Sequence, residues 1–369
     1  MFTDAWEKIR ATYVYTNLNG VDWEAVRTKL EPQVRAATTA PAFYAVMTEL
    51  VQQLHDNGAT TFEPPSVPDA VADLGKPYTG VGILFVADGG QTVVMEVWPD
   101  SPAAQAGIRR RDVLLAVDGV QPANFDDWFR RVRGAEGSPV RLTVRSPGQA
   151  PRDVTMTRRV ITGDPQVDAH RLAAAPGIGY VWVPGLFLES TRTAIENGLT
   201  SLLQGSPLQG LILDLRYTGR GPADTLSPLI RDFMTGDGGR LVSRMGSEPM
   251  GGTPRRLYAQ LQNVPVIMLV SGDTGGIPEM WAAALQTAGR ARLVGQPTPG
   301  YAGLIQPYDL ADGSHLEVLA EVYEPPGGAR LIGHGLKPDV LVTGDWQVTS
   351  EDADPGIRQA TALLQAGKK

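Results

Sequence analysis

The spacing of hydrophobic residues divides the chain into three kinds of segment. In residues 3–56 apolar side chains recur every three or four positions, as Trp6, Ile9 and Tyr13 do, and this spacing is typical of one face of an amphipathic helix. We therefore predict an N-terminal helical region. The proline-rich stretch that begins at residue 63 indicates a linker.

Short apolar runs separated by turn residues fill residues 78–160. Such runs favour β-strands, and they lie at residues 80–88, 91–99, 112–119 and 139–147. Two short helices are expected at residues 101–108 and 124–134. Together these elements predict a small barrel-like β domain with two helices.

From residue 161 onward, continuous apolar runs alternate with amphipathic segments. The runs are at residues 177–185, 208–216, 264–270 and 290–295, and the predicted helices are at 189–205, 222–236, 278–289 and 351–366. Continuous apolar strands between helices are typical of a largely parallel sheet covered on both faces. The chain is therefore expected to be an α/β multidomain protein.

Composition and charge exclude several function classes. A net charge of −7 argues against a nucleic-acid-binding surface. The absence of cysteine excludes disulfides, thiolate metal sites and a cysteine nucleophile. No phosphate loop, no HExxH motif and no zinc-ligand spacing occurs, so no cofactor or metal is expected.

The sequence also lacks the usual membrane signals. No apolar run reaches the length of about 20 residues needed to span a bilayer, and no signal-peptide pattern precedes Phe2. We therefore expect no membrane span. The sequence indicates no particular oligomeric state.

The stretch "SGDTGGIPE" at residues 271–279 joins an apolar strand to a helix through glycines. A strand, a tight turn and a helix N-terminus often present a nucleophile beside free backbone amides. The turn from Gly272 to Ile277, however, contains no Ser, Cys or Lys. The backbone pattern of an active site is therefore present without its usual chemistry.

Residues 78–160 resemble a PDZ domain through "YTGVGILF" (78–85) and "VWPDSPAAQAGIRRRDVLLAVDG" (97–119). The resemblance implies that a peptide adds a strand to the domain and that loop amides hold its terminal carboxylate. The peptide-binding residues would be Thr79, Gly80, Val81, Gly82, Ile83, Leu84 and Phe85. A simpler interpretation makes Gly80 and Gly82 turn glycines only. Arg111, where most relatives have glycine, is treated as a minor departure.

The whole chain resembles the C-terminal-processing, or tail-specific, serine peptidases. The similar segments are "LQGLILDLR" (208–216), "GRARLVGQPTPG" (289–300) and "GHGLKPDVLV" (333–342). The resemblance implies an N-terminal helical region, a linker, a PDZ-like domain and a peptidase-like α/β sandwich core. The corresponding residues are 1–66, 67–77, 78–160 and 161–369. It also implies an extracytoplasmic location.

Members of this family use a Ser–Lys dyad and a loop of oxyanion-binding amides. When the family pattern S-A-S-A-S-E is placed on "TGGIPE", the nucleophile falls on Gly276, and the lysine falls on Tyr301. The family loop D-L-R-N-N-P-G-G becomes "DLRYTGRG". Its altered part is Gly219, Arg220 and Gly221, where a bulky cation is expected to crowd the loop.

These replacements favour a catalytically inactive member that binds peptides or protein C-termini as an adaptor, scaffold or regulatory subunit. The alternative is an active peptidase that uses Thr274 or Ser271 as its nucleophile, with His334 as a conceivable partner. A third hypothesis is an assembly subunit that binds no peptide. Asp214 and Asp273 could also form a carboxylate pair, although the resemblance implies a structural role for Asp214.

Overall fold

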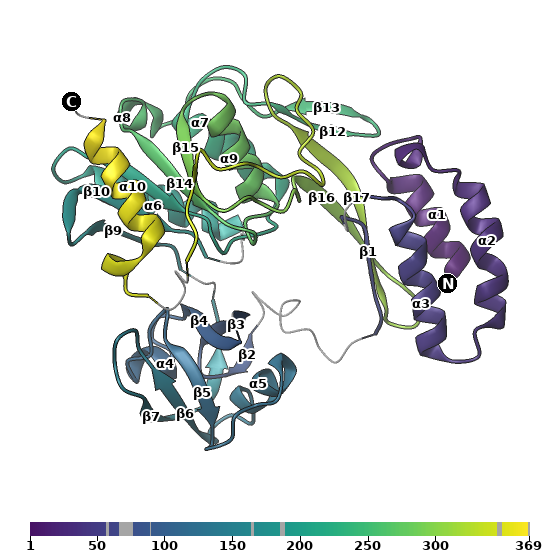
Figure 1. Cartoon of the computed structure of the whole chain (residues 1–369), viewed down its shortest axis with the longest axis horizontal. Helices are drawn as coiled ribbons and strands as arrows, with labels where there is room; N and C mark the ends of the chain where they lie inside the picture. Colours follow the sequence, from purple (N-terminus) through teal and green to yellow (C-terminus); the bar gives the residue numbers. More distant parts are fainter. Residues whose placement is uncertain are drawn as a thin grey trace.

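The computed structural model describes residues 1–56, 59–65, 77–88, 90–163, 166–184, 189–344 and 349–367. A helical region, a β domain and an α/β core are visible as three parts (Figure 1). The predicted fold class is confirmed. The linker predicted at residues 67–77 lies outside the described residues except for Pro77.

The N-terminal region contains the helices α1 (Phe2–Thr12), α2 (Trp23–Ala36) and α3 (Ala40–Gln52). Side-chain oxygens cap the N-termini of α2 and α3: Asp22 accepts the Ala25 amide, and Thr39 accepts the Ala42 amide. The apolar faces pack against one face of a β-sheet, and the shared cluster includes Trp6, Leu50, Leu316 and Val318. The helical region is therefore fixed to the core.

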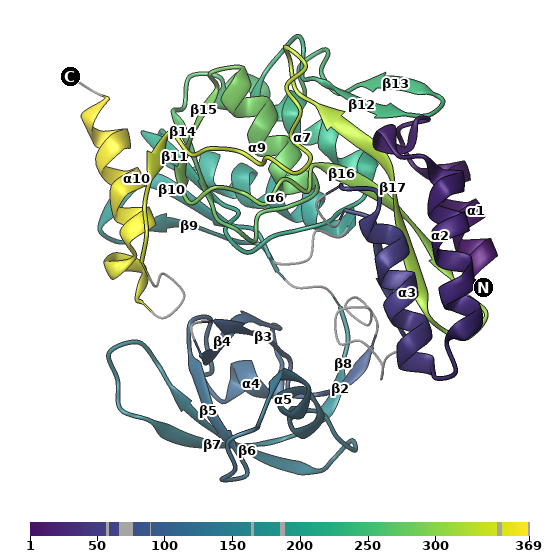
Figure 2. The ribbon, with the colours of Figure 1, turned by 45° about the vertical axis from the view of Figure 1, so that its right-hand side comes forward.

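That β-sheet is antiparallel and was not predicted. Its strands are β1 (Thr61–Glu63), β12 (Arg240–Ser243), β13 (Gly246–Pro249), β16 (Gly303–Asp309) and β17 (His315–Glu324). The long strand β17 pairs with β1, β12 and β16. Figures 1 and 2 show this sheet between the N-terminal helices and the rest of the core.

The predicted parallel sheet has the order β18-β15-β14-β11-β10-β9, and only its edge strand β9 is antiparallel. The strands are β9 (Asp168–Leu172), β10 (Ala175–Trp182), β11 (Gly210–Asp214), β14 (Val266–Val270), β15 (Ala291–Gly295) and β18 (Val340–Leu341). The helices are α6 (Glu189–Leu203), α7 (Leu226–Phe233), α8 (Tyr258–Leu261), α9 (Ile277–Thr287) and α10 (Pro355–Ala366).

Both faces of the parallel sheet are buried, as its apolar strands predicted. Met268 of β14 packs on the side that carries α6, α7 and α9. Its neighbours Ile267 and Leu269 pack on the opposite side with α10 and with Met95 of the β domain. Within the described ranges, no helix is long and apolar enough to cross a membrane.

The β domain contains two sheets and two helices. The first sheet is β3 (Ile83–Asp88), β4 (Gln91–Val97), β5 (Val113–Val117), β6 (Pro139–Arg145) and β7 (Arg152–Thr157), in that order, and the second is β2 (Tyr78–Gly80) with β8 (Arg159–Ile161). The helices are α4 (Pro102–Gln105) and α5 (Phe125–Val132). Because β3 lies at a sheet edge, it offers the unpaired edge that strand addition requires.

A buried ionic network connects the β domain to the core, and Arg111 is the residue that the β domain contributes to it. The Arg111 guanidinium bonds to Asp354 at 2.9 Å and to the Thr349 carbonyl at 2.8 Å. Arg216 then bridges Asp354 and Asp214. Arg111 is only 5% exposed and has a φ of 76°, which L-residues adopt at a cost. The substitution at position 111 is therefore not the minor departure that the sequence suggested.

Candidate functional site

A cleft of about 950 Å³ opens beside the turn between β14 and α9. Its walls come from the loop 217–223, from Gly275 and Gly276, from Tyr301 and from strands β16 and β17. The predicted site is therefore a real depression on the core. We call it the cleft below.

Gly276 cannot carry a side chain without a rearrangement. It is the residue that precedes α9 and has a φ of 61°, a conformation that favours glycine. A Cβ atom added here would lie 2.6 Å from the backbone nitrogen of Arg220 and 2.7 Å from its Cα. These contacts are with backbone, which cannot rotate away.

The backbone amides around this turn are already bonded within the chain. The Gly275 amide donates to the Thr218 carbonyl at 3.1 Å, and the Ile277 amide donates to the Arg220 carbonyl at 3.0 Å. The Gly276 amide donates to the Tyr301 carbonyl at 3.1 Å. An oxyanion site needs donors that point at the substrate oxygen, and these three donors point at carbonyls instead.

Arg220 closes the site with its backbone and not, as expected, with its side chain. Its side chain was expected to crowd the loop, but the guanidinium pairs with Glu317 of β17 at 2.8 and 3.3 Å and remains 62% exposed. The backbone of Arg220, with a φ of 59°, lies against Gly276. The segment Gly219–Gly221 therefore closes over the turn through its main chain.

The two candidate hydroxyls are buried and hydrogen-bonded. Thr274 is fully buried; its Oγ1 donates to the Leu215 carbonyl at 2.7 Å and accepts the Ser271 amide at 2.9 Å. Ser271 Oγ donates to the Arg216 carbonyl and accepts the Asp273 amide at 3.1 Å. At this turn the cleft is lined by Gly272, Asp273, Gly275 and Gly276. Both hydroxyls therefore support the turn.

Glu279 is a site residue whose role the sequence did not reveal. It is fully buried, and its carboxylate accepts the Thr298 hydroxyl, the Gly300 amide at 2.9 Å and the Tyr301 amide at 2.6 Å. Burial raises the pKa of Glu279 to about 7, against these three donors, which lower it. The sequence feature that could have indicated this role is the single carboxylate in the otherwise apolar helix segment "IPEMWAAAL".

Tyr301 and His334 line two different depressions. Tyr301 is 47% exposed and lines the cleft. His334 lines a neighbouring cavity, and its Nδ1 bonds to the Ile332 carbonyl at 3.0 Å. The structure thus does not bring His334 to Thr274 or Ser271.

Asp214 belongs to the ionic network of the core. Tyr180 donates to it at 2.8 Å, and Arg216 Nε donates to it at 2.9 Å. Burial alone would raise the pKa of Asp214, but Arg216 lowers it below its usual range. Within the described part of the chain, no three acidic or histidine side chains gather as a metal site would require.

The predicted peptide-binding stretch runs along the edge of the β domain. Ile83 and Phe85 face α5, and the Phe85 ring lies 5.0 Å from that of Phe129. Leu84 points the opposite way, into a cluster with Trp98. Gly82 has a φ of 80°, and a Cβ added to it would lie 2.2 Å from Ser101 Cβ, so this position requires glycine whether or not a peptide binds.

The remaining residues of that stretch support the turn before β3. Thr79 and Gly80 pair with β8, opposite Val160 and Arg159. Val81 is fully buried, and its carbonyl accepts the Ala103 amide at 2.9 Å. The backbone edge of β3, together with the aromatic side chains of α5, therefore forms the candidate groove.

Three family models match the chain. The model of peptidase family S41 matches residues 177–342, a PDZ domain model matches 93–146, and the tricorn protease C1 domain model matches 1–52. The three matched ranges lie in the core, the β domain and the N-terminal helical region, respectively.

Two relatives and one solved structure agree with the family models. The chloroplastic C-terminal processing peptidase of Tetradesmus obliquus is 31% identical over 92% of this chain and 76% of its own length. A carboxyl-terminal-processing protease of Picosynechococcus is 29% identical over 93% and 82%. The structure of a photosystem II D1 C-terminal processing protease aligns with a TM-score of 0.57 and 26% identity over 97% of this chain and 95% of the other. The chain therefore belongs to peptidase family S41, together with the C-terminal processing peptidases, and carries a PDZ domain.

Proposed function

We propose that this chain is a non-catalytic homologue of the C-terminal processing peptidases. It binds peptides or protein C-termini through its PDZ groove and acts as an adaptor, scaffold or regulatory subunit. The observation that carries the proposal is Gly276, which stands at the nucleophile position with the Arg220 backbone 2.6 Å from where its Cβ would be.

The chemistry of the cleft supports the same proposal. Acyl transfer by this family needs a nucleophile, a neutral lysine and oxyanion donors. Here Tyr301 stands at the lysine position, and the nearby amides donate to carbonyls of the chain. Loss of all three elements removes the covalent step while the turn, the helix and the cleft remain folded.

The alternative proposal is a peptidase with Thr274 or Ser271 as its nucleophile. It would require these hydroxyls to leave their hydrogen bonds to the Leu215 and Arg216 carbonyls and to find a base. We weigh it below the first proposal because neither hydroxyl lines the cleft.

An activity measurement on the purified protein tests the proposal. We expect no turnover of unfolded casein above a buffer blank and no labelling by a fluorophosphonate probe. A second S41 peptidase with an intact dyad, assayed in parallel, controls for the substrate and the probe. Turnover that disappears in Thr274→Ala or Ser271→Ala would establish the alternative.

A further inference from the structure

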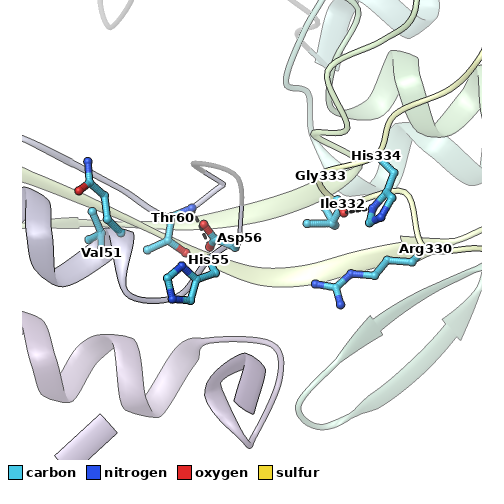
Figure 3. Close-up of a pocket in the computed structure, with 9 residues that line it drawn as sticks. Val51, His55, Asp56, Thr60, Arg330, Ile332, Gly333 and His334 are labelled. Atoms are coloured by element: carbon cyan, nitrogen blue, oxygen red, sulfur yellow. Dashed lines mark hydrogen bonds between the residues drawn. The ribbon is translucent and has the colours of Figure 1, made fainter. Parts of the chain in front are cut away.

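A second cavity, of about 420 Å³, lies where the end of α3 meets the segment 330–334 (Figure 3). We call it the joint pocket. Val51 and Ile332, 5% and 3% exposed, form its apolar floor. Its polar lining includes His55, Asp56, Arg330 and His334. Neither the dyad positions nor the PDZ groove contribute to it.

The joint pocket adjoins the loop that carries Tyr301. Ile332 lines both the joint pocket and the cleft. The Gly333 amide donates to the Gly300 carbonyl at 3.0 Å. The joint pocket is therefore a separate chamber that adjoins the cleft.

The polar groups of the joint pocket include donors that a ligand can use. One Arg330 nitrogen donates to Asn19 at 3.2 Å, and its guanidinium lies over the Tyr15 ring at 5.4 Å. A guanidinium has five N–H groups, so, among the residues that the structure describes, this bond leaves donors for a ligand. Figure 3 shows the Arg330 side chain extending toward the side where His55 lies.

Two histidines also line the joint pocket. The His334 Nδ1–H donates to the Ile332 carbonyl at 3.0 Å, so Nε2 is the acceptor nitrogen of the neutral ring and can take a hydrogen bond from an N–H group of a ligand. His55 has a φ of 51° at the pocket rim. Two imidazoles and one guanidinium therefore line a single chamber.

The charges favour a particular ligand class. The buried Asp56 carboxylate accepts the Thr60 amide at 3.0 Å, and its negative charge offsets the positive charge of Arg330. A dianion would be repelled by Asp56, whereas a single carboxylate matches the planar guanidinium of Arg330. The apolar floor favours a short hydrocarbon stem over water.

We propose that the joint pocket binds a monocarboxylate with a short apolar stem. The group is the free C-terminal carboxylate of a peptide or a small acid of the size of one amino acid. This site is independent of the PDZ groove, and its existence does not depend on whether the cleft catalyses cleavage.

Histidine ring NMR on the full chain tests the proposal. The chain has four histidines; His55 and His334 line the pocket, whereas His170 bonds Asp168 and Glu351, and His315 bonds Asp309. We expect N-acetyl-leucine to shift the signals of His55 and His334 only. N-acetyl-leucinamide should shift none, and inorganic phosphate should bind at least about tenfold more weakly.

The same spectra separate this site from the proposed PDZ function, because residues 78–161 contain no histidine. A peptide that ends in Leu and shifts His55 and His334 where N-acetyl-leucine does not would support a chain terminus as the ligand. Shifts from N-acetyl-leucine alone would support a free acid. Unmoved His55 and His334 signals with both compounds, or equal shifts from the amide, would overturn the proposal.

Titration calorimetry of two variants supplies the second readout. Arg330→Gln should weaken binding of N-acetyl-leucine about tenfold or more, the usual worth of a hydrogen bond to a charged group. His55→Gln should weaken it less. Arg35→Gln, an exposed arginine on α2, is the matched control and should bind as the parent does. Unchanged binding in Arg330→Gln, with an unchanged unfolding midpoint, would contradict the proposal.

Discussion

At the scale of single residues, the turn before α9 depends on the absence of a side chain at position 276. The positive φ of Gly276 and the Arg220 backbone beside it act together, so a serine there would meet both strain and overlap. Gly272, in the same turn, has no positive φ, and a Cβ atom added to it would have no other atom within 4 Å. A side chain should therefore be tolerated at position 272 but not at position 276.

Substitution of Gly276 by serine tests this difference. We expect Gly276→Ser to lower the free energy of unfolding by about 2 kcal/mol or more, since its backbone conformation (φ 61°, ψ −136°) alone costs a residue with a side chain about 1–3 kcal/mol. Gly272→Ser, the matched control, should change it by less than about 0.5 kcal/mol. Urea unfolding measures both, and equal effects would show that the Arg220 loop moves freely.

The same variant bears on catalysis. Gly276→Ser combined with Tyr301→Lys would supply both dyad residue types at the positions that the resemblance assigns to them, yet we expect no appreciable casein turnover. The amides of Gly275 and Ile277 would still donate to carbonyls of the chain, and a dyad must be placed within about 0.5 Å. A turnover number near 10 per second, typical of enzymes, would contradict this expectation.

Glu279 gives the molecule a pH dependence with a defined sign. Burial raises its pKa from 4.5 to about 7, so the folded state holds this proton more tightly than the unfolded chain. Its contribution to stability is fully present below pH 4.5 and is lost as the pH rises through 7. The loss is on the order of 3 kcal/mol, at about 1.4 kcal/mol per pKa unit.

Chemical unfolding at several pH values checks this contribution. The free energy of unfolding of the parent protein should fall more steeply between pH 5 and pH 8 than that of Glu279→Gln, which cannot titrate. Glu248→Gln, at an exposed position on β13, should keep the parent slope. Parallel curves for the parent and Glu279→Gln would refute the raised pKa.

At the scale of elements, local pattern predicted some parts well and others not at all. The helices α1 to α3 and the strands β10, β11, β14 and β15 have continuous or regularly spaced apolar residues, so they could be predicted. The antiparallel sheet could not, because β17 pairs not only with the preceding strand at 303–309 but also with residues 61–63 and 240–243, which are far away in the sequence. No local pattern reports such distant partners.

The candidate site likewise has features that the sequence could predict and features that it could not. The resemblance assigns Gly276 and Tyr301 to the dyad positions from their place in a motif, and this assignment stays a prediction. The closure of the turn could not be predicted, since it depends on where the loop at Arg220 lies in space. The role of Arg111 also required the structure, because its partner Asp354 is 243 positions away.

Arg111 should stabilise the contact between the PDZ domain and the core. Arg111→Gly removes the buried bond to Asp354, and breaking a buried ion pair costs about 3–5 kcal/mol. Glycine adopts the positive φ without the cost of about 1–2 kcal/mol that an L-residue bears. We therefore expect the free energy of unfolding to fall by a net amount of roughly 2 kcal/mol. Hydrogen exchange in β4, which packs on the core through Val93 and Met95, should accelerate.

Asp100→Gly provides the control for backbone relaxation, because Asp100 has a φ of 57° and an exposed side chain. It should leave the free energy of unfolding unchanged or slightly higher. If Arg111→Gly behaves in the same way, the ionic network does not hold the PDZ domain to the core.

At the scale of the whole molecule, binding and cleavage draw on different parts of the chain. The cleft lies between the parallel sheet and the sheet of β16 and β17, whereas β3 and α5 belong to the PDZ domain. The PDZ domain packs on the opposite side of the parallel sheet from α9. The proposed loss of catalysis at the cleft would therefore leave the PDZ groove intact.

The groove should bind peptides that end in an apolar residue with a free carboxylate. Strand addition along β3 supplies main-chain hydrogen bonds, and the aromatic side chains beside Phe85 receive the last residue. We expect micromolar affinity, about −8 kcal/mol. Amidation of the terminus should cost about 1.5–3 kcal/mol, the worth of a hydrogen bond to a charged group. Titration calorimetry of a free-acid and amide pair measures this difference, with Arg330→Gln used to remove any binding at the joint pocket. Equal affinities, or no binding of any C-terminal peptide, would instead favour an assembly subunit that binds no peptide.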